Sequence, residues 1–292
     1  MSKGLLDPKV DFVFKNIFGS PNHPEILISF LNATLKAKKK IVNGDIKKTD
    51  IEKQYIEDKY SRLDVKATTS NDEIINIEIQ LKNENNMVKR SLYYLSKMYE
   101  EQLNEKEDYS KLVRTVCINI LNFKYLKTDN FHTGYRFKEI ESNEELTDIM
   151  EVHFIEIPKL QDSSDEKDML VAWTEFLKDP ESEKVRGLEL SIEEIRQAKD
   201  ELIRMSNDST QRELYDMRAN SLRDKMSELN AAERKGIEKG REEGREEGRK
   251  EGIEEGRKEE KIEIARNMKL SGLDINTIAK ITNLSEDEID KL

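Results

Sequence analysis

Two acidic residues, Asp64 and Glu78, lie in neighbouring stretches whose residue pattern predicts a β-hairpin. Charged and apolar residues alternate over residues 62–67, and polar residues alternate with isoleucine or leucine over residues 75–82. This period of two is typical of half-buried strands. The intervening Ser-Asn-Asp, residues 70–72, favours a tight turn. If these three residues form the loop, residue 69 pairs with residue 73, and Asp64 then lies opposite Glu78.

Facing carboxylates on such a hairpin indicate a cation between them. The Cβ atoms of a cross-strand pair lie roughly 5 Å apart, and like charges at that distance destabilise the pairing. A hard divalent ion such as Mg²⁺ or Mn²⁺, which prefers oxygen ligands, would compensate the two charges. The alternative is a register shifted by one residue, which would put the two acids on opposite faces and leave a coincidental polar face.

The spacing from Asp64 to Gln80, D-x13-E-x-Q, resembles the active-site motif of PD-(D/E)XK phosphodiesterases, although Gln80 occupies the place of the motif lysine. A fuller resemblance rests on four motifs in order. They are DFVFKNIFG at 11–19, RLDV at 62–65, IEIQ at 77–80 and RSLYYL at 90–95. Together they are similar to the Rpn family of recombination-promoting nucleases and transposases, in which glutamine is usual at this position. The C-terminal part of the chain resembles that family too.

The resemblance implies metal-assisted hydrolysis of DNA phosphodiester bonds. Asp64 and Glu78 would be ligands of Mg²⁺ or Mn²⁺, and Gln80 would hold a water or a phosphate oxygen. Lys66, on the same polar face as Asp64, would supply the positive charge that Gln80 lacks. Lys82 and Lys15 are the other candidates for that charge.

Three further residues extend this hypothesis. Asp11, on the first expected helix, could be a third metal-site acid, or it could interact with the helix dipole at the surface. Arg90 and Tyr94 are four residues apart and share one face of the next helix. Their spacing is similar to a Gln-x3-Tyr element of some superfamily nucleases, which implies phosphate contact. Surface charge and helix packing are the alternative for both.

Composition limits the other classes of function. The formal net charge of −11 argues against wrapping nucleic acid with the whole surface, but it permits a local basic groove. The single cysteine, Cys117, lies in an apolar run and is expected in a core, which suits a reducing cytosol. No apolar run could span a membrane and the N-terminus has no signal-peptide pattern, so we expect a cytoplasmic protein. His23, His132 and His153 are far apart in the sequence, and no histidine cluster is expected.

The order of elements predicts an α/β fold. We expect helices over 7–18 and 24–35, with Asp7 as cap and Pro8 at the first position of the first helix. A short strand is expected within 36–59, a helix over 87–103, strands over 112–121 and 151–157, and helices over 165–230. The lone Trp173 is expected in the core. With the resemblance, this favours a restriction-endonuclease-like mixed sheet flanked by helices, with a helical C-terminal extension.

We divide the chain into a nuclease domain (1–160), a helical region (161–230), a charged repeat (231–261) and a small helix-turn-helix-like module (262–292). In the repeat, glycine recurs at every fourth residue from Gly236 to Gly256. Each glycine costs a helix roughly 1 kcal/mol relative to alanine. The repeat is therefore either a solvated linker or a helix whose glycines admit a second helix. Asp274 is expected to cap the second helix of the module, and Ser285 with Glu288 to form a capping box.

The sequence thus predicts a Mg²⁺- or Mn²⁺-dependent DNA endonuclease that forms a homo-oligomer through its C-terminal helices. The alternative is a catalytically silent DNA-associated or self-assembling scaffold. The residues do not distinguish DNA from RNA as substrate.

Overall fold

The computed structural model describes residues 4–36, 39–42, 47–48, 65–69, 72–165 and 167–292. Asp64 lies outside these residues. The chain divides into two compact units, residues 1–222 and 223–292, which are described separately. No helix in the described ranges has the length and apolar character needed to cross a membrane.

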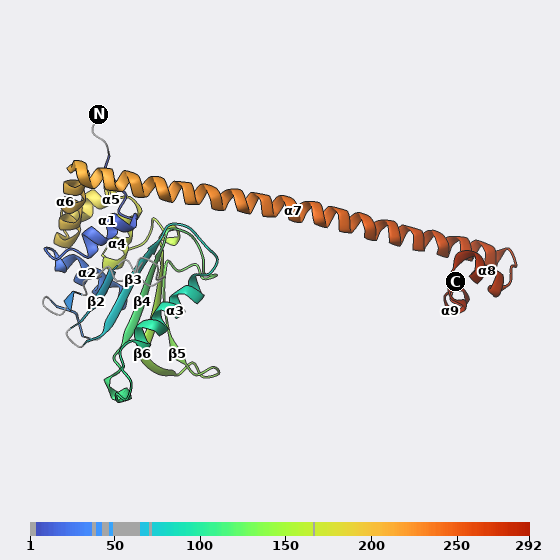
Figure 1. Ribbon diagram of the computed structural model, residues 1–292, viewed down its shortest axis with the longest axis horizontal. Coiled ribbons are helices and arrows are strands. Elements are labelled where there is room, and N and C mark those ends of the chain that lie inside the picture. Colours follow the sequence, from blue (N-terminus) through green and yellow to red (C-terminus); the bar gives the residue numbers. More distant parts are fainter. Residues whose placement is uncertain (1–3, 37–38, 43–46, 49–64, 70–71, 166) are drawn as a thin grey trace. The chain divides into compact units, whose positions relative to one another are not determined.

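A mixed sheet forms the centre of the first unit (Figure 1). In spatial order its strands are β1 (Lys47–Lys48), β2 (Val65–Thr68), β3 (Ile74–Gln80), β4 (Thr115–Leu121), β6 (Glu145–Glu156) and β5 (His132–Lys138). The strands β3, β4 and β6 run parallel, while β1, β2 and β5 pair antiparallel with their neighbours. The helix α3 (Met87–Glu100) joins β3 to β4, the usual crossover between parallel strands. The predicted α/β fold is confirmed.

Two strand predictions need correction. The strand β5 was not predicted, and β6 begins at Glu145 rather than at residue 151. The two form an antiparallel hairpin whose outer part is exposed, so its residues lack the apolar alternation by which half-buried strands are recognised.

The predicted register of the first hairpin is confirmed over the described residues. Val65 pairs with Ile77, and Thr68 pairs with Ile74. The backbone N–H of Thr69 donates to the carbonyl oxygen of Glu73 over 3.0 Å, as a loop of residues 70–72 requires. The expectation of a half-buried second strand is wrong, because all five central residues of β3 are buried.

The two faces of β3 and β4 meet different partners. Odd-numbered residues of β3 join the large core together with α1 (Asp11–Phe18), α2 (Pro24–Leu35), α4 (Met169–Lys178), α5 (Glu183–Glu189) and α6 (Glu193–Asn207). Phe18 and Trp173 pack edge to face in that core, with ring centroids 5.3 Å apart, so Trp173 is a core residue as predicted. The opposite face lies beneath α3, where Cys117 is buried, also as predicted (Figure 1). The described part of this unit also contains two short 3-10 turns, Tyr109–Lys111 and Ile157–Lys159.

The first helix begins later than predicted. The helix α1 starts at Asp11, and its cap position is Val10, so Asp7 and Pro8 do not begin it. Instead the Asp7 carboxylate accepts a hydrogen bond from the backbone N–H of Lys9 over 2.9 Å. The short side chain of an aspartate can close such a local turn as readily as it can cap a helix.

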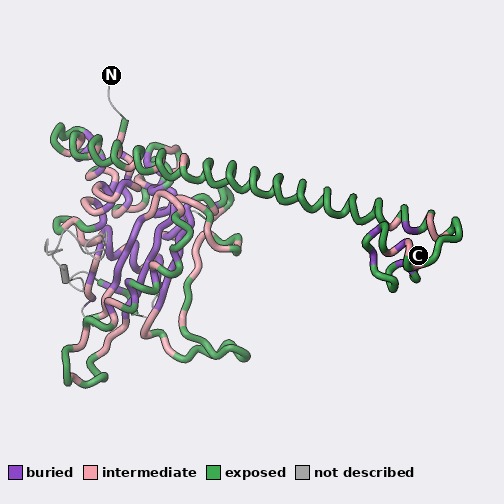
Figure 2. Tube along the Cα trace, turned by 45° about the vertical axis from the view of Figure 1, so that its right-hand side comes forward, coloured by how far each residue is buried: buried purple, intermediate pink, exposed green. Residues whose placement is uncertain are grey.

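The second unit contains most of α7 (Ser209–Leu270), followed by α8 (Ile275–Thr282) and α9 (Glu286–Asp290). The glycine repeat is helical, and every residue from 232 to 261 is exposed (Figure 2). Apolar residues of all three helices, among them Ala265, Ile278 and Ile289, form a small core. Asp274 caps α8, and Ser285 with Glu288 forms the predicted capping box of α9.

Candidate metal and phosphate site

Glu78 lies at the centre of β3 and is only 1% exposed. Its position follows from the alternation in β3, where odd-numbered isoleucines enter the large core and even-numbered residues face α3. Arg90, in the first turn of α3, donates from Nε to Oε2 of Glu78 over 3.3 Å. The guanidinium carbon of Arg90 lies 5.3 Å from the ring centroid of Tyr94. The structure therefore brings together Glu78, Arg90 and Tyr94.

Polar residues that the sequence analysis did not single out continue this face of the sheet. Asn76 and Glu78 on β3 pair in register with Cys117 and Asn119 on β4, and all four are buried. Ser91 of α3 donates to Oδ1 of Asn119 over 2.8 Å. The alternating polar residues of β4 were the signal for this strip, but its apolar β-branched residues dominated the pattern.

Cys117 is a poor nucleophile in this setting. Burial, together with the nearby charge of Glu78, raises the pKa of its thiol to about 12. At neutral pH the thiol stays protonated, and the protonated thiol is the less reactive form.

The donor atoms on this face fit a hard divalent ion. Glu78 supplies a buried carboxylate, and Oδ1 of Asn76 is buried without a hydrogen-bond partner among the described residues. Carboxylate and amide oxygens are the ligands that Mg²⁺, Mn²⁺ and Ca²⁺ prefer. Within the described ranges no three His, Cys, Asp or Glu residues form a metal-binding group. A complete site would therefore need a further acid, for which Asp64 is the predicted residue.

The other predicted site residues occupy different surroundings. Gln80 ends β3, where its backbone oxygen accepts from the N–H of Asn122 over 2.9 Å. Lys66 pairs with Asn76 across β2 and β3, while its neighbours Val65 and Ala67 are buried in the large core. Lys66 therefore lies on the Glu78 face, as predicted.

Asp11 has a partner of its own. Its carboxylate accepts from Nη1 of Arg218, in α7, over 2.9 Å. The helix α1 packs into the large core, whereas Glu78 faces α3 on the other side of the sheet. No described contact joins Asp11 to Glu78, and its role as a metal ligand stays a prediction.

The expectation that the histidines do not cluster is wrong for two of them. Nε2 of His132 and Nδ1 of His153 lie 2.9 Å apart, and the rings stack with centroids separated by 5.2 Å. Nε2 of His153 in turn lies 2.8 Å from a carboxylate oxygen of Glu151. Antiparallel pairing of β5 with β6 creates this cluster by placing Gly134 opposite His153. Sequence separation could not reveal it.

Burial and hydrogen bonding shift the pKa values of His132 and Glu151 in this cluster. Burial, together with the proximity of His153, lowers the pKa of His132 to about 4. Burial would raise the pKa of Glu151, but hydrogen bonds from His153 and Arg114 outweigh burial and lower it to about 2. At neutral pH His132 is uncharged and Glu151 is ionised. The cluster is thus a buried structural network on the face opposite Glu78.

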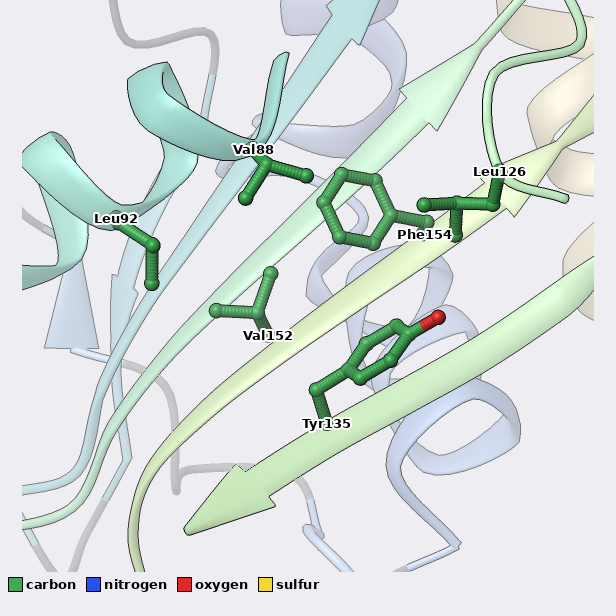
Figure 3. A pocket seen from close by; sticks show the side chains of 6 residues that line it. All are labelled: Val88, Leu92, Leu126, Tyr135, Val152 and Phe154. Carbon is green, nitrogen blue, oxygen red and sulfur yellow. The ribbon is translucent and has the colours of Figure 1, made fainter.

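An apolar cavity of about 290 Å³ opens beside α3. Figure 3 shows side chains of α3, β5, β6 and the loop after β4 around it: Val88, Leu92, Leu126, Tyr135, Val152 and Phe154. The Tyr135 hydroxyl is the polar group among these side chains. Such a lining suits neither a metal ion nor a phosphate.

Comparison with known proteins supplies the family. A family model described as PD-(D/E)XK nuclease family transposase matches residues 8–232. A second, described as the C-terminal HTH domain of the Rpn/YhgA-like nuclease family, matches residues 258–292. No curated protein matches the chain, and no solved structure matches it. The first match covers more than half of the chain, and the mixed α/β fold agrees with it. The chain therefore belongs to the PD-(D/E)XK nuclease family transposases and carries the C-terminal HTH domain of Rpn/YhgA-like nucleases.

Proposed function

We propose that this protein is a metal-dependent DNA endonuclease. The observation that carries the proposal is Glu78, a carboxylate buried at the centre of β3 on the face to which Lys66 also belongs. Continuing the register of β2 and β3 by one residue would pair position 64 with Glu78. Asp64 and Glu78 would then hold one Mg²⁺ or Mn²⁺ between them.

When bound, such an ion polarises a phosphodiester and lowers the pKa of a bound water. Gln80 orients that water or a phosphate oxygen through its amide. Lys66 supplies positive charge near the scissile group, in place of the lysine that Gln80 replaces. Arg90 and Tyr94 contact the flanking phosphate, for which a guanidinium is well suited. Asp11 is the remaining proposed acid of the metal site.

The test is nicking of supercoiled plasmid DNA by the purified chain with Mg²⁺, with Mn²⁺ and with EDTA. We expect cleavage with either ion, and its loss in Asp64→Ala and in Glu78→Ala. The double variant should lose no more activity than either single variant, because the two ligands act as a unit. Wild-type protein that cleaves no DNA with any divalent ion would refute the proposal. Parallel reactions with RNA decide between the two nucleic acids.

A self-assembling scaffold is the second candidate, favoured by one observation. Residues 232–261 form a helix that is exposed throughout, although six glycines weaken it. A homo-oligomer joined through the C-terminal helices would stabilise this helix. Divalent ions discriminate the candidates, because an occupied metal site raises the thermal stability by mass action and a scaffold shows no such increase.

We further propose the domain boundaries given above, with catalysis in residues 1–160 and DNA contact supported by the module at 262–292. A cytoplasmic location suits a chain whose single thiol, Cys117, is buried.

A further inference from the structure

We propose that Arg90 is a displaceable counter-ion of Glu78, which balances the buried carboxylate before a metal binds and moves to a substrate phosphate afterwards. The inference rests on the metal site proposed above. It adds that one guanidinium serves two anions in turn, so metal binding and DNA binding reinforce each other.

Burial makes a cation at Glu78 necessary even without metal. The carboxylate is 1% exposed, and an ionised carboxylate withdrawn from water is strongly destabilised unless a positive charge accompanies it. Arg90 supplies that charge over 3.3 Å. The contact uses Oε2 of Glu78, and an incoming divalent ion needs oxygens of the same carboxylate. Metal and guanidinium repel each other, so they compete for Glu78.

The side chain of Arg90 is positioned so that it can move away from Glu78. Its side chain is 23% exposed, in contrast to the buried acid, and it extends from the first turn of α3. The guanidinium lies over the ring of Tyr94, which is itself 5% exposed and fixed beneath the helix. The face of the Tyr94 ring can stabilise the guanidinium both while it contacts Glu78 and after it has turned towards the surface. Side-chain rotation is therefore enough to carry the guanidinium from Glu78 to the surface.

A phosphate is the natural second acceptor. The planar guanidinium forms paired hydrogen bonds with phosphate oxygens. A metal at Glu78 would release Arg90 for DNA, and DNA that holds Arg90 would remove a competitor of the metal at Glu78. By linkage the two effects on affinity must be equal.

The first measurement is calorimetric titration of Ca²⁺ into the full chain without DNA, for wild type, Arg90→Gln and Arg90→Lys. Removing the competitor should tighten Ca²⁺ binding by about 5- to 100-fold in Arg90→Gln, within the usual range of coupling between sites. Arg90→Lys keeps the charge and should lie between wild type and Arg90→Gln. In a DNA-binding assay, Ca²⁺ should strengthen binding by wild type more than by Arg90→Gln.

Arg114→Gln is the matched control. Arg114 pairs with the buried Glu151 in a part-buried ion pair on the opposite face of the sheet. Both arginine-to-glutamine changes should lower the melting temperature of the metal-free protein. Ca²⁺ should raise the melting temperature of Arg90→Gln by more than it raises that of Arg114→Gln, which keeps the competing Arg90, and a purely structural role of Arg90 does not predict this difference.

A measurement on wild type covers the case in which Arg90→Gln fails to fold. The Nε–H resonance of Arg90, assigned by its absence from Arg90→Lys, should shift on Ca²⁺ titration as the contact with Glu78 breaks. Tight Ca²⁺ binding by wild type without that shift, or equal or weaker Ca²⁺ binding by Arg90→Gln, would overturn the inference and leave the metal site standing. Wild type that binds neither Ca²⁺ nor Mn²⁺ would remove the metal site and this inference together.

Discussion

The chemical role of a buried acid in this protein depends on the partners of its side chain. Glu78 and Glu151 are both acids on buried strands, and each is ion-paired with arginine. Arg90 is part-exposed beside Glu78, whereas Glu151 accepts from Arg114, Arg136 and His153. A carboxylate with three cationic or hydrogen-bonding partners has little capacity left for a metal, so Glu151 is a poor candidate for a metal ligand.

The lowered pKa of His132 makes the stability of the fold dependent on pH. The fold keeps His132 neutral by lowering its pKa from 6.5 to about 4, mainly through burial. The unfolded chain takes up a proton below pH 6.5, so the free energy of unfolding should fall between about pH 6.5 and pH 4, by at most about 3 kcal/mol. Urea unfolding across this range should show a smaller fall for His132→Gln.

Glu151 contributes to the pH dependence of stability at lower pH than His132, so the two contributions can be measured separately. Its pKa is lowered from 4.5 to about 2, so its stabilisation is present above pH 4.5 and is lost as the pH falls towards 2. An equal loss of stability between pH 6.5 and 4 in wild type and His132→Gln would contradict the assignment to His132.

Gly134 predicts a steric effect in the same cluster. A Cβ at this position would lie 3.1 Å from Cε1 and 3.2 Å from Nδ1 of the His153 ring, which Glu151 and His132 hold in place. Gly134→Ala should therefore destabilise the fold by about 1–3 kcal/mol. The control is Gly187→Ala in α5, whose Cβ would meet nothing within 4 Å in the described structure and should be neutral or stabilising. Equal denaturation midpoints for the two variants would contradict this account.

Among the elements, α3 has the largest effect on the candidate site. Its buried residues, including Met87, Tyr94 and Leu95, cover the face of the sheet that holds Glu78. This cover turns an alternating strand, which by itself would be half exposed, into one buried on both faces.

The repeated glycines of α7 are expected to lower the stability of this helix. In the described structure, nothing lies within 4 Å of a Cβ built on Gly244 or Gly248, so alanine fits there. Each change should stabilise the helix by about 1 kcal/mol, measured by circular dichroism during thermal unfolding of the full chain. Gly272→Ala is the control with the opposite sign, because its φ of +83° is strained for alanine. If the glycines pack against a second helix in an oligomer, the two α7 variants will weaken self-association in sedimentation experiments.

For the whole molecule, the division into two units predicts where the native protein is cut. Residues 232–261 have no buried side chain, and they are rich in lysine and arginine. Local opening of a helix that buries no side chain requires little free energy. Brief digestion with trypsin under native conditions should therefore cut first within these residues and leave a fragment containing the sheet. Degradation of the sheet while residues 223–292 stay intact would contradict this division.

The sequence by itself determined the features that depend on local interactions. The register of β2 with β3 follows from a loop of three residues and two alternating strands. As predicted, Thr69 bonds to Glu73 and Val65 pairs with Ile77. The caps of α8 and α9 at Asp274 and Ser285 also depend on neighbours within one turn. The family motifs, read in order, indicate the fold without any information on contacts between distant residues.

Tertiary structure decided the features that join distant parts of the chain. Pairing of β5 with β6 brings His132 to His153, and packing of α3 over the sheet buries Glu78 and gives it Arg90 as a partner. No periodicity encodes these outcomes, because each depends on which surfaces pack together and on the partners that a buried charge then requires.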